Sequence, residues 1–411
     1  MRTLICSLLL ASGTVLTSPI ALAQQPKVEV PVEAAAKVES TQARAKAMAE
    51  KAIAFLKSKQ DASGGWSVTP GQPTFPAITG LVLQGMLMHE GVTIKDASVA
   101  KGVGFILSKK QPDGGFYDKL LPVYNTAICL SALAKVNTSE ASAAIKPAQD
   151  FLKGLQYGEG AVVIEGAKDS PQKVAKSDPF YGGWGYGNRG RPDMSNTGFA
   201  LEALRVSGVE SSDAAIQRAL VFLERCQMHH TVNAMEYAQG SMQGGFIYST
   251  SENQDNVGVG QSFAKNNMIE ETLSDGSKAS RLRAYGSMTY LGFKSYAYAG
   301  LSPSDSRVQL ALEWISRNYT LSENPGAGLD GVYYYYLVFA RALGASNESM
   351  LKVMGADGKP VARDWKRDLV EELAKLQNAD GSFRSVNERW MENNDVLITA
   401  YALIALQEAA R

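Results

Sequence analysis

A short turn of one kind recurs along this 411-residue chain, and its recurrence limits the fold more than any other feature. In each copy a helical segment closes on Gln or a similar residue, a Gly-rich turn leads to an aromatic residue, and a second, apolar helix follows. The clearest copies occupy residues 60–66, 111–116 and 377–383, and weaker ones lie at 181–184 and 243–246. Units repeated at this spacing cannot bury their apolar faces alone, so they must stack on one another.

The helices that flank these turns follow two patterns. The first helix of each pair is charged and has one apolar stripe. These first helices are predicted at residues 43–60, 96–111, 144–156, 213–227, 304–319 and 363–377. The second helix is nearly uncharged, and a Thr in it is followed by an apolar residue at +4, a small one at +6 and an apolar one at +7. The six positions are Thr79, Thr126, Thr197, Thr289, Tyr336 (in place of Thr) and Thr399.

A helix that is apolar all round is buried on every side, and a small residue at a fixed phase lets neighbouring helices approach closely. The pattern therefore predicts an all-α fold, an (α/α)6 toroid of six inner and six outer helices over residues 43–411. Every connection from an outer to an inner helix then lies at one end of the ring. Most long insertions, including residues 247–282 and 384–394, are such connections, so we expect functional groups at that rim.

The N-terminus predicts export. Residues 1–23 have the charge, apolar run and small-residue cleavage site of a secretory signal peptide, with a retained membrane anchor as the alternative. Residues 24–42, rich in Pro, Glu, Lys and Ala, are expected to form a flexible leader. The mature chain is thus expected to be periplasmic or extracellular and to have no membrane span. Acidic and basic residues balance at 41 each, so no global charge favours nucleic acid.

The turns and the double helical layer resemble the terpenoid cyclase and protein prenyltransferase superfamily, and most closely the squalene–hopene cyclase and prenyltransferase repeat proteins. Squalene–hopene-type cyclases carry Asp-x-Asp-Asp-Thr at the start of an inner helix, and the middle Asp protonates the isoprenoid. Here the same place reads Asp193-Met194-Ser195-Asn196-Thr197. Because a Ser hydroxyl is no strong acid toward an alkene, this departure argues against that chemistry.

The zinc chemistry of the prenyltransferases is also missing from the matching positions. Those enzymes hold zinc with Asp-x-Cys on one inner helix and a His just before the Thr of a later one. This chain has Asp193-Met194-Ser195 and Ile398-Thr399 there, which leaves one carboxylate where tetrahedral zinc needs at least three protein ligands. No metal and no cofactor is therefore expected.

Two carboxylates at helix starts are the candidate catalytic residues. Asp193 and Asp395 each stand four residues before the repeat Thr, and three units separate them around the ring. N-capping of the two helices is the simpler interpretation. Facing each other across the rim, the pair would instead suit acid and base work on a glycosidic bond.

Aromatic and charged residues near the same rim are the candidate ligand-binding groups. Tyr residues concentrate on the fourth inner helix and open the fifth as four consecutive Tyr, of which some must face the lumen and others their neighbours. The candidates are Trp184, Tyr186, Arg191, Tyr285, Tyr296, Tyr334, Trp390 and Glu392.

Three functions remain open from the sequence. The first is a repeat-like protein whose central cavity binds an apolar, isoprenoid-class small molecule without the usual acid or metal. The second is a glycan-binding or glycan-cleaving toroid that uses the rim carboxylates. The third is a non-catalytic toroid that binds a protein partner through the insertion at residues 247–282.

Overall fold

The computed structural model describes residues 32–66, 75–159, 173–187, 191–346 and 348–411. The predicted signal peptide lies outside these residues. The predicted flexible leader is wrong for residues 32–42, because the first helix, α1 (Val32–Ser58), already begins at Val32. The segment from Val32 to Lys37 is rich in Ala, Glu and Lys, which favour helix, and composition alone did not separate such a helix from a leader.

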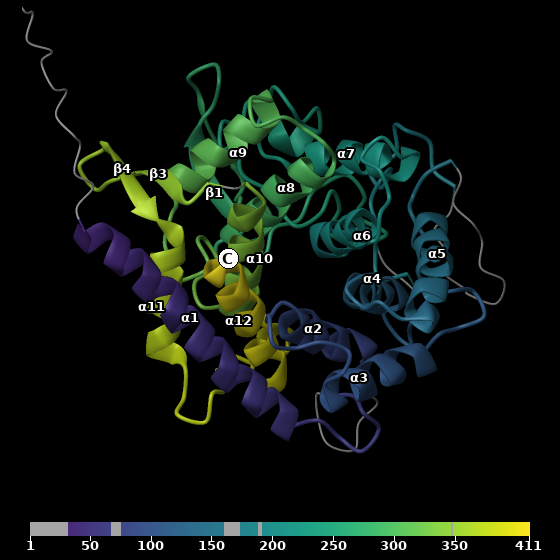
Figure 1. The fold of residues 1–411 in the computed structure, drawn as a ribbon. Helices are drawn as coiled ribbons and strands as arrows, with labels where there is room; N and C mark the ends of the chain where they lie inside the picture. Colours follow the sequence, from purple (N-terminus) through teal and green to yellow (C-terminus); the bar gives the residue numbers. More distant parts are fainter. Residues whose placement is uncertain (1–31, 67–74, 160–172, 188–190, 347) are drawn as a thin grey trace, which may run out of the picture.

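Twelve α-helices in the described residues form two concentric layers (Figure 1). The outer helices are α1, α3 (Ala97–Ser108), α5 (Ser139–Gly154), α7 (Ala214–Cys226), α9 (Ser306–Arg317) and α11 (Trp365–Leu376). The inner helices are α2 (Pro76–Leu87), α4 (Pro122–Leu133), α6 (Met194–Val206), α8 (Gly286–Tyr298), α10 (Val332–Ala345) and α12 (Asp395–Ala410). Each inner helix contacts the next, and α12 contacts α2, so the ring closes. The predicted all-α toroid is confirmed.

The repeat Thr has a structural role that its spacing did not reveal. The hydroxyl of Thr197 on α6 accepts a hydrogen bond of 3.0 Å from the backbone N–H of Trp184, the aromatic residue that ends the preceding turn. The same bond recurs in four other units, from Trp66 to Thr79, Phe116 to Thr126, Phe246 to Thr289 and Phe383 to Thr399. Each Thr thereby satisfies a buried donor and fixes the turn to the inner helix.

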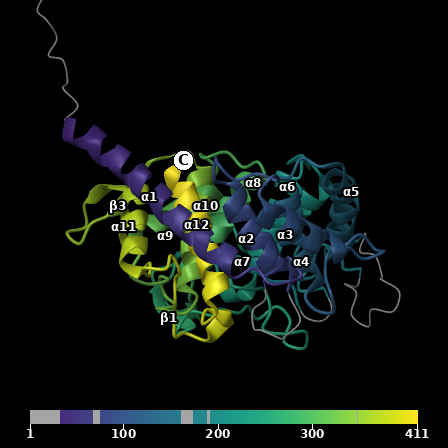
Figure 2. The same cartoon turned by 60° about the horizontal axis from the view of Figure 1, so that its bottom comes forward.

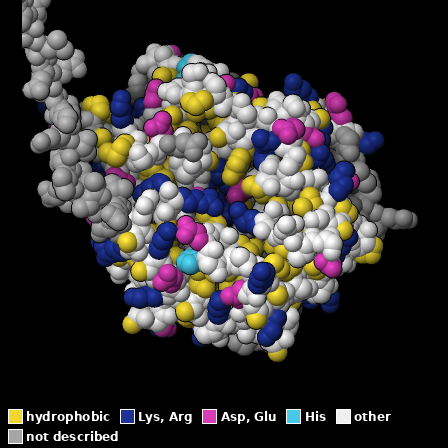
Figure 3. Space-filling view, viewed as in Figure 1, with side chains coloured by type: hydrophobic (Ala, Val, Ile, Leu, Met, Phe, Trp, Pro, Cys, Tyr) yellow, Lys and Arg dark blue, Asp and Glu magenta, His cyan; other side chains and the backbone are white. Residues whose placement is uncertain are grey.

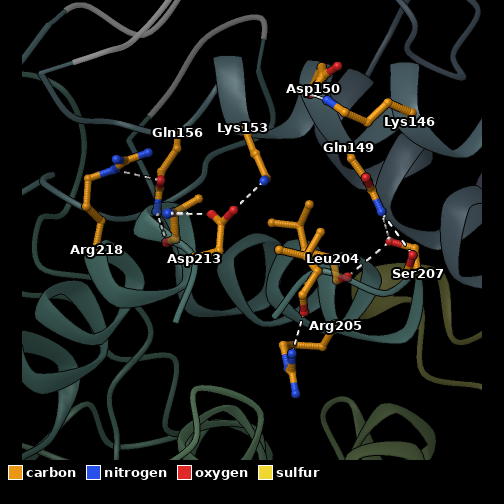
Figure 4. A network of polar contacts seen from close by, with 12 residues as sticks. Lys146, Gln149, Asp150, Lys153, Gln156, Leu204, Arg205, Ser207, Asp213 and Arg218 are labelled. Atoms are coloured by element: carbon orange, nitrogen blue, oxygen red, sulfur yellow. Dashed lines mark hydrogen bonds and ion pairs between the residues drawn. The ribbon is translucent and has the colours of Figure 1, made fainter. Parts of the chain in front are cut away.

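The Gln of the turn links neighbouring units. The amide nitrogen of Gln156 donates to the carbonyl oxygens of Gly182 in its own turn and Ala215 on α7, while its oxygen accepts from Arg218 (Figure 4). The equivalent Gln377 donates to Met48 on α1, which joins the last unit to the first.

Glycine is required in these turns because the backbone comes very close to the next outer helix. Gly381 has a φ of +87°, and a Cβ there would lie 2.2 Å from the carbonyl oxygen of Lys51. Corresponding contacts at Gly64, Gly114, Gly182 and Gly244 repeat this approach around the ring.

Two small antiparallel hairpins interrupt the helical pattern and were not predicted. Strands β1 (Met268–Thr272) and β2 (Lys278–Leu282) lie within the insertion at residues 247–282, and β3 (Met350–Met354) pairs with β4 (Pro360–Asp364) between α10 and α11. Figure 2 shows β1 at the end of the ring where the inner helices begin and β3 toward the other end.

Candidate functional site

A cavity of about 250 Å³ occupies the lumen at the end where the inner helices begin. All six inner helices, or the residues that cap them, contribute to its wall, together with the insertions at 247–282 and 384–394. The wall is mostly aromatic and aliphatic. Its residues are Phe75, Ile78, Leu121, Tyr124, Tyr186, Ser195, Phe199, Tyr248, Tyr285, Ser287, Met288, Tyr334, Trp390, Met391, Glu392, Leu397 and Tyr401.

A single position of the repeat supplies much of this wall. The residue two places before the repeat Thr (or Tyr336) lines the cavity in five units, as Tyr124, Ser195, Ser287, Tyr334 and Leu397. Of the four consecutive Tyr, only Tyr334 faces the lumen, where its hydroxyl lies 3.1 Å from the Ser195 hydroxyl. Tyr335 and Tyr336 instead donate to the carbonyl oxygens of Thr320 and Leu321. The expected division of this run between lumen and neighbours is correct.

Unusual backbone geometry gathers at the cavity. Among the described residues, only Leu121, Trp390 and Met391 are non-glycine residues with positive φ, at 54°, 54° and 65°, and all three line the cavity. Such conformations cost free energy and persist where the surrounding structure holds them, often at ligand sites. Trp390 packs over Gly331 at the start of α10, so close that a Cβ on Gly331 would lie 2.9 Å from the indole.

Glu392 is the only carboxylic acid among the described residues that line the cavity. Its Oε1 accepts two hydrogen bonds of 2.9 Å, from the backbone N–H groups of Tyr333 and Tyr334 in the first turn of α10. Its Oε2 is buried and has no hydrogen-bond partner. Burial raises the pKa of Glu392 to about 7, against the opposing effect of the backbone N–H groups. The side chain therefore changes charge near neutral pH.

The two predicted catalytic carboxylates do not line the cavity, so the structure does not assemble them into the expected pair. Asp193 is fully buried and caps α6. Its carboxylate accepts a hydrogen bond of 2.9 Å from the backbone N–H of Asn196. Burial raises the pKa of Asp193. Asp395 lies in the first turn of α12, which Asn394 caps, and its carboxylate is 3.2 Å from Arg384. Helix capping and surface ion pairing explain both residues.

Five of the eight predicted ligand-binding residues line the cavity, namely Tyr186, Tyr285, Tyr334, Trp390 and Glu392. The other three do not. Trp184 is buried between the layers and its indole donates to Leu152 at 2.6 Å. Tyr296 lies at the +7 position, which faces the outer layer, and donates to Gln227 at 2.8 Å. The guanidinium of Arg191 lies 5.1 Å from the centre of the Tyr248 ring, and Arg191 itself does not line the cavity.

Sequence reasoning missed several wall residues, including Leu121, Tyr124, Phe199, Tyr248 and Tyr401. Tyr124 could have been found from its place two residues before Thr126, and Phe199 and Tyr401 from theirs two residues after a repeat Thr. Within the described residues, no three His, Cys, Asp or Glu side chains gather as a metal site would require. No helix in the same residues has the length and apolar character of a membrane span.

The sequence matches the squalene–hopene cyclase C-terminal domain family over residues 72–247, which is less than half of the chain. No curated protein matches. A type II terpene cyclase from Scytonema, solved with its substrate geranylgeranyl dihydroxybenzoate, is similar with a TM-score of 0.52 and 14% identity, over 90% of this chain and 99% of that one.

An α-1,6-mannanase from a Salegentibacter species, solved as an inactive variant with α-1,6-mannotriose, is similar with a TM-score of 0.54 and 8% identity, over 89% of this chain and 99% of that one. At such low identities, these two structures establish the fold alone. Together with the family match, they confirm the expected resemblance to the terpenoid cyclase-like α/α toroids.

Proposed function

We propose that this chain, a terpenoid cyclase-like α/α toroid, binds an apolar small molecule of the isoprenoid class in its lumenal cavity. The observation that carries the proposal is the composition of the wall, in which aromatic and aliphatic side chains from every inner helix surround few polar groups. Such concave, largely apolar sites with a few placed polar groups are typical of small-molecule binding. The Scytonema cyclase, whose substrate carries a geranylgeranyl chain, has the same fold.

The polar groups in the wall favour binding over cyclisation started by a strong acid. Ser195 lines the cavity where the cyclases carry their acidic Asp, and it is hydrogen-bonded to Tyr334. Glu392, with a pKa raised to about 7, is too weak an acid to protonate an isolated alkene. It can donate a hydrogen bond when neutral, so a ligand with one oxygen at the end of an apolar chain fits best.

Farnesol, an isoprenoid alcohol, is the probe for this proposal. We expect saturable binding by calorimetry to the full chain, and loss of that binding in Ser195→Phe, which would fill the cavity. Ser142→Phe adds the same ring at an exposed position on α5 and should bind as the wild type does. Equal affinity in both variants, or no binding to the wild type, would refute the proposal.

Glycan cleavage is less well supported. Glycosidases of the usual kind need two carboxyl groups flanking the bond, and the described wall contains Glu392 alone. The Salegentibacter mannanase shares the fold at 8% identity. A similarity at this level does not indicate that this chain binds the same substrate. Titration with α-1,6-mannotriose should therefore give no saturable heat under the conditions in which farnesol binds.

The insertion at residues 247–282 also has features of a protein-binding surface. Val257, Val259 and Met268 are exposed on it. However, Tyr248 in the same insertion lines the cavity, and its ring packs 4.5 Å from that of Phe263. This contact favours a role for the insertion in the wall of the ligand site. Export after removal of residues 1–23 remains our proposal, and sequencing the mature N-terminus tests it.

A further inference from the structure

A second, polar region of the lumen lies beyond the cavity. The lumen-facing residues recur at positions −2, +2, +5 and +9 relative to the repeat Thr, since these offsets fall on one face of a helix. From position −2 to position +5 a helix rises about 10 Å. The +5 residues are Gln84, Ser131, Glu202, Lys294, Arg341 and Ile404, so a layer rich in charge crosses the ring above an apolar cavity.

One carboxylate in this layer is shared by two cations. Glu202 forms ion pairs with Lys294 and, at 2.9 Å, with Arg341. Arg341 also donates to the side-chain oxygen of Gln84 at 2.6 Å. All four side chains are buried, with Lys294 only 1% exposed. Within this layer, two buried cations face one buried carboxylate, an excess of one positive charge.

Lys294 retains unused hydrogen-bonding capacity. Its ammonium has three donors, and its only hydrogen-bond acceptor among the described residues is Glu202. The centre of the Tyr298 ring lies 5.6 Å from the Lys294 nitrogen. A buried ammonium with free donors is costly unless another acceptor approaches it.

Further cations lie above this layer, toward the end of the ring where the inner helices finish. Lys135, at position +9, is exposed, and its pKa is lowered by partial desolvation and by the charges of Arg341 and Arg411. Arg411 is compensated by Glu408 at 3.2 Å. Figure 3 shows Lys and Arg side chains gathered around a hollow at the centre of this face. Four cations, Lys135, Lys294, Arg341 and Arg411, therefore share two carboxylates, Glu202 and Glu408.

We propose that this hollow binds a small oxyanion, a phosphate or a compact carboxylate, between Lys135 and the buried layer of Lys294 and Arg341. The anion would lie beside Lys135 and over the buried layer, where it would offset the excess positive charge. The ends of the six inner helices carry partial negative charge that stabilises cations as well. That effect acts within the last turn, whereas Lys294 and Arg341 lie four residues before the ends of their helices. This site is separate from the cavity and does not depend on the function proposed for it.

Inorganic phosphate is the probe, titrated into the full chain at pH 7 with chloride adjusted to hold ionic strength constant. We expect saturable binding at one site and a rise in the unfolding temperature. Lys135→Gln should weaken the affinity about fivefold, as expected for one partly exposed charge near an anion. The control is Lys278→Gln on β2, which removes an exposed Lys at the other end of the ring. This variant should bind phosphate with unchanged affinity.

The proposal would be overturned if every salt raised the unfolding temperature equally, or if Lys135→Gln and Lys278→Gln weakened phosphate binding equally. The helix ends alone would then offset the positive charge of the buried layer. Lys135→Glu provides a second test, because it reverses an exposed charge without disturbing the buried layer. It should abolish the rise in unfolding temperature that phosphate produces. An undiminished rise would exclude this hollow as the binding site.

Discussion

Raising the pH from 5 to 8 should destabilise the protein through one side chain, Glu392. Burial raises its pKa from the ordinary value of 4.5 to about 7 in the folded protein. The folded state therefore binds this proton more tightly than the unfolded chain does. The resulting stabilisation is fully present below pH 4.5 and is lost as the pH rises through 7. Each tenfold difference in proton affinity is worth about 1.4 kcal/mol, so the whole loss is about 3 kcal/mol.

Urea unfolding of the wild type and Glu392→Gln at several pH values isolates this contribution. The Gln oxygen can still accept from the N–H groups of Tyr333 and Tyr334, so the variant resembles the neutral acid. We expect the two proteins to have similar free energies of unfolding at pH 5. At pH 8 the wild type should be less stable than the variant by about 3 kcal/mol.

The reasoning fails if the difference between the two proteins does not change with pH. It also fails if the wild type gains stability over the variant as the pH rises. That second outcome would mean that the hydrogen bonds to Oε1 outweigh burial and that the carboxylate is the favoured form, acting as a cap for α10.

Three further changes test the frame of the toroid, each measured as the free energy of unfolding. Gly381→Ala should lower the free energy of unfolding by at least about 2 kcal/mol more than Gly276→Ala does. Both glycines have positive φ, but only Gly381 lies against a neighbouring backbone. Equal losses in the two variants would contradict the close-approach argument. Thr197→Val should cost about 1–3 kcal/mol by stranding the Trp184 N–H, and Thr197→Ser should recover most of it; a neutral Val variant would contradict this role. Glu202→Gln should cost about 3–5 kcal/mol because it leaves two buried cations without their carboxylate. Glu270→Gln, in the exposed pair with Lys278, should cost less than about 1 kcal/mol, and similar losses in both would argue against a buried ion layer.

The sequence predicted the fold well because its decisive signals are local. The Gly of the turn makes the same close approach to an outer helix in five of the six units, so five copies reinforce one interpretation. The start of α1 was misplaced because composition alone did not distinguish a charged leader from a helix. The hairpins were missed because each occurs once, inside an insertion, with no second copy to support it.

The site was predicted in part, for a physical reason that Asp193 and Tyr296 illustrate. Both residue types suit ligand binding, but the residue type does not tell which way a side chain points. Asp193 turns back to cap its own helix, and Tyr296 lies on the stripe that faces the outer layer. Glu392 does line the cavity, yet its hydrogen bonds to α10 come from a loop whose path the repeat does not determine.

The offset from the repeat Thr explains how one repeat builds a lumen with two different ends. Offsets 0, +4 and +7 face the turns and the outer helices, which is why they are uniform from unit to unit. Offsets −2, +2, +5 and +9 face the lumen, where six units meet and no two need be alike. At −2 the six differ as Ala77, Tyr124, Ser195, Ser287, Tyr334 and Leu397, and at +5 they differ in charge. The ion pairs of Glu202 cross the ring at the +5 layer, between the apolar cavity and the end where the inner helices finish. One repeat thus supplies an apolar cavity, with Trp390 and Met391 in its wall, at one end of the lumen and a buried cluster of ion pairs toward the other.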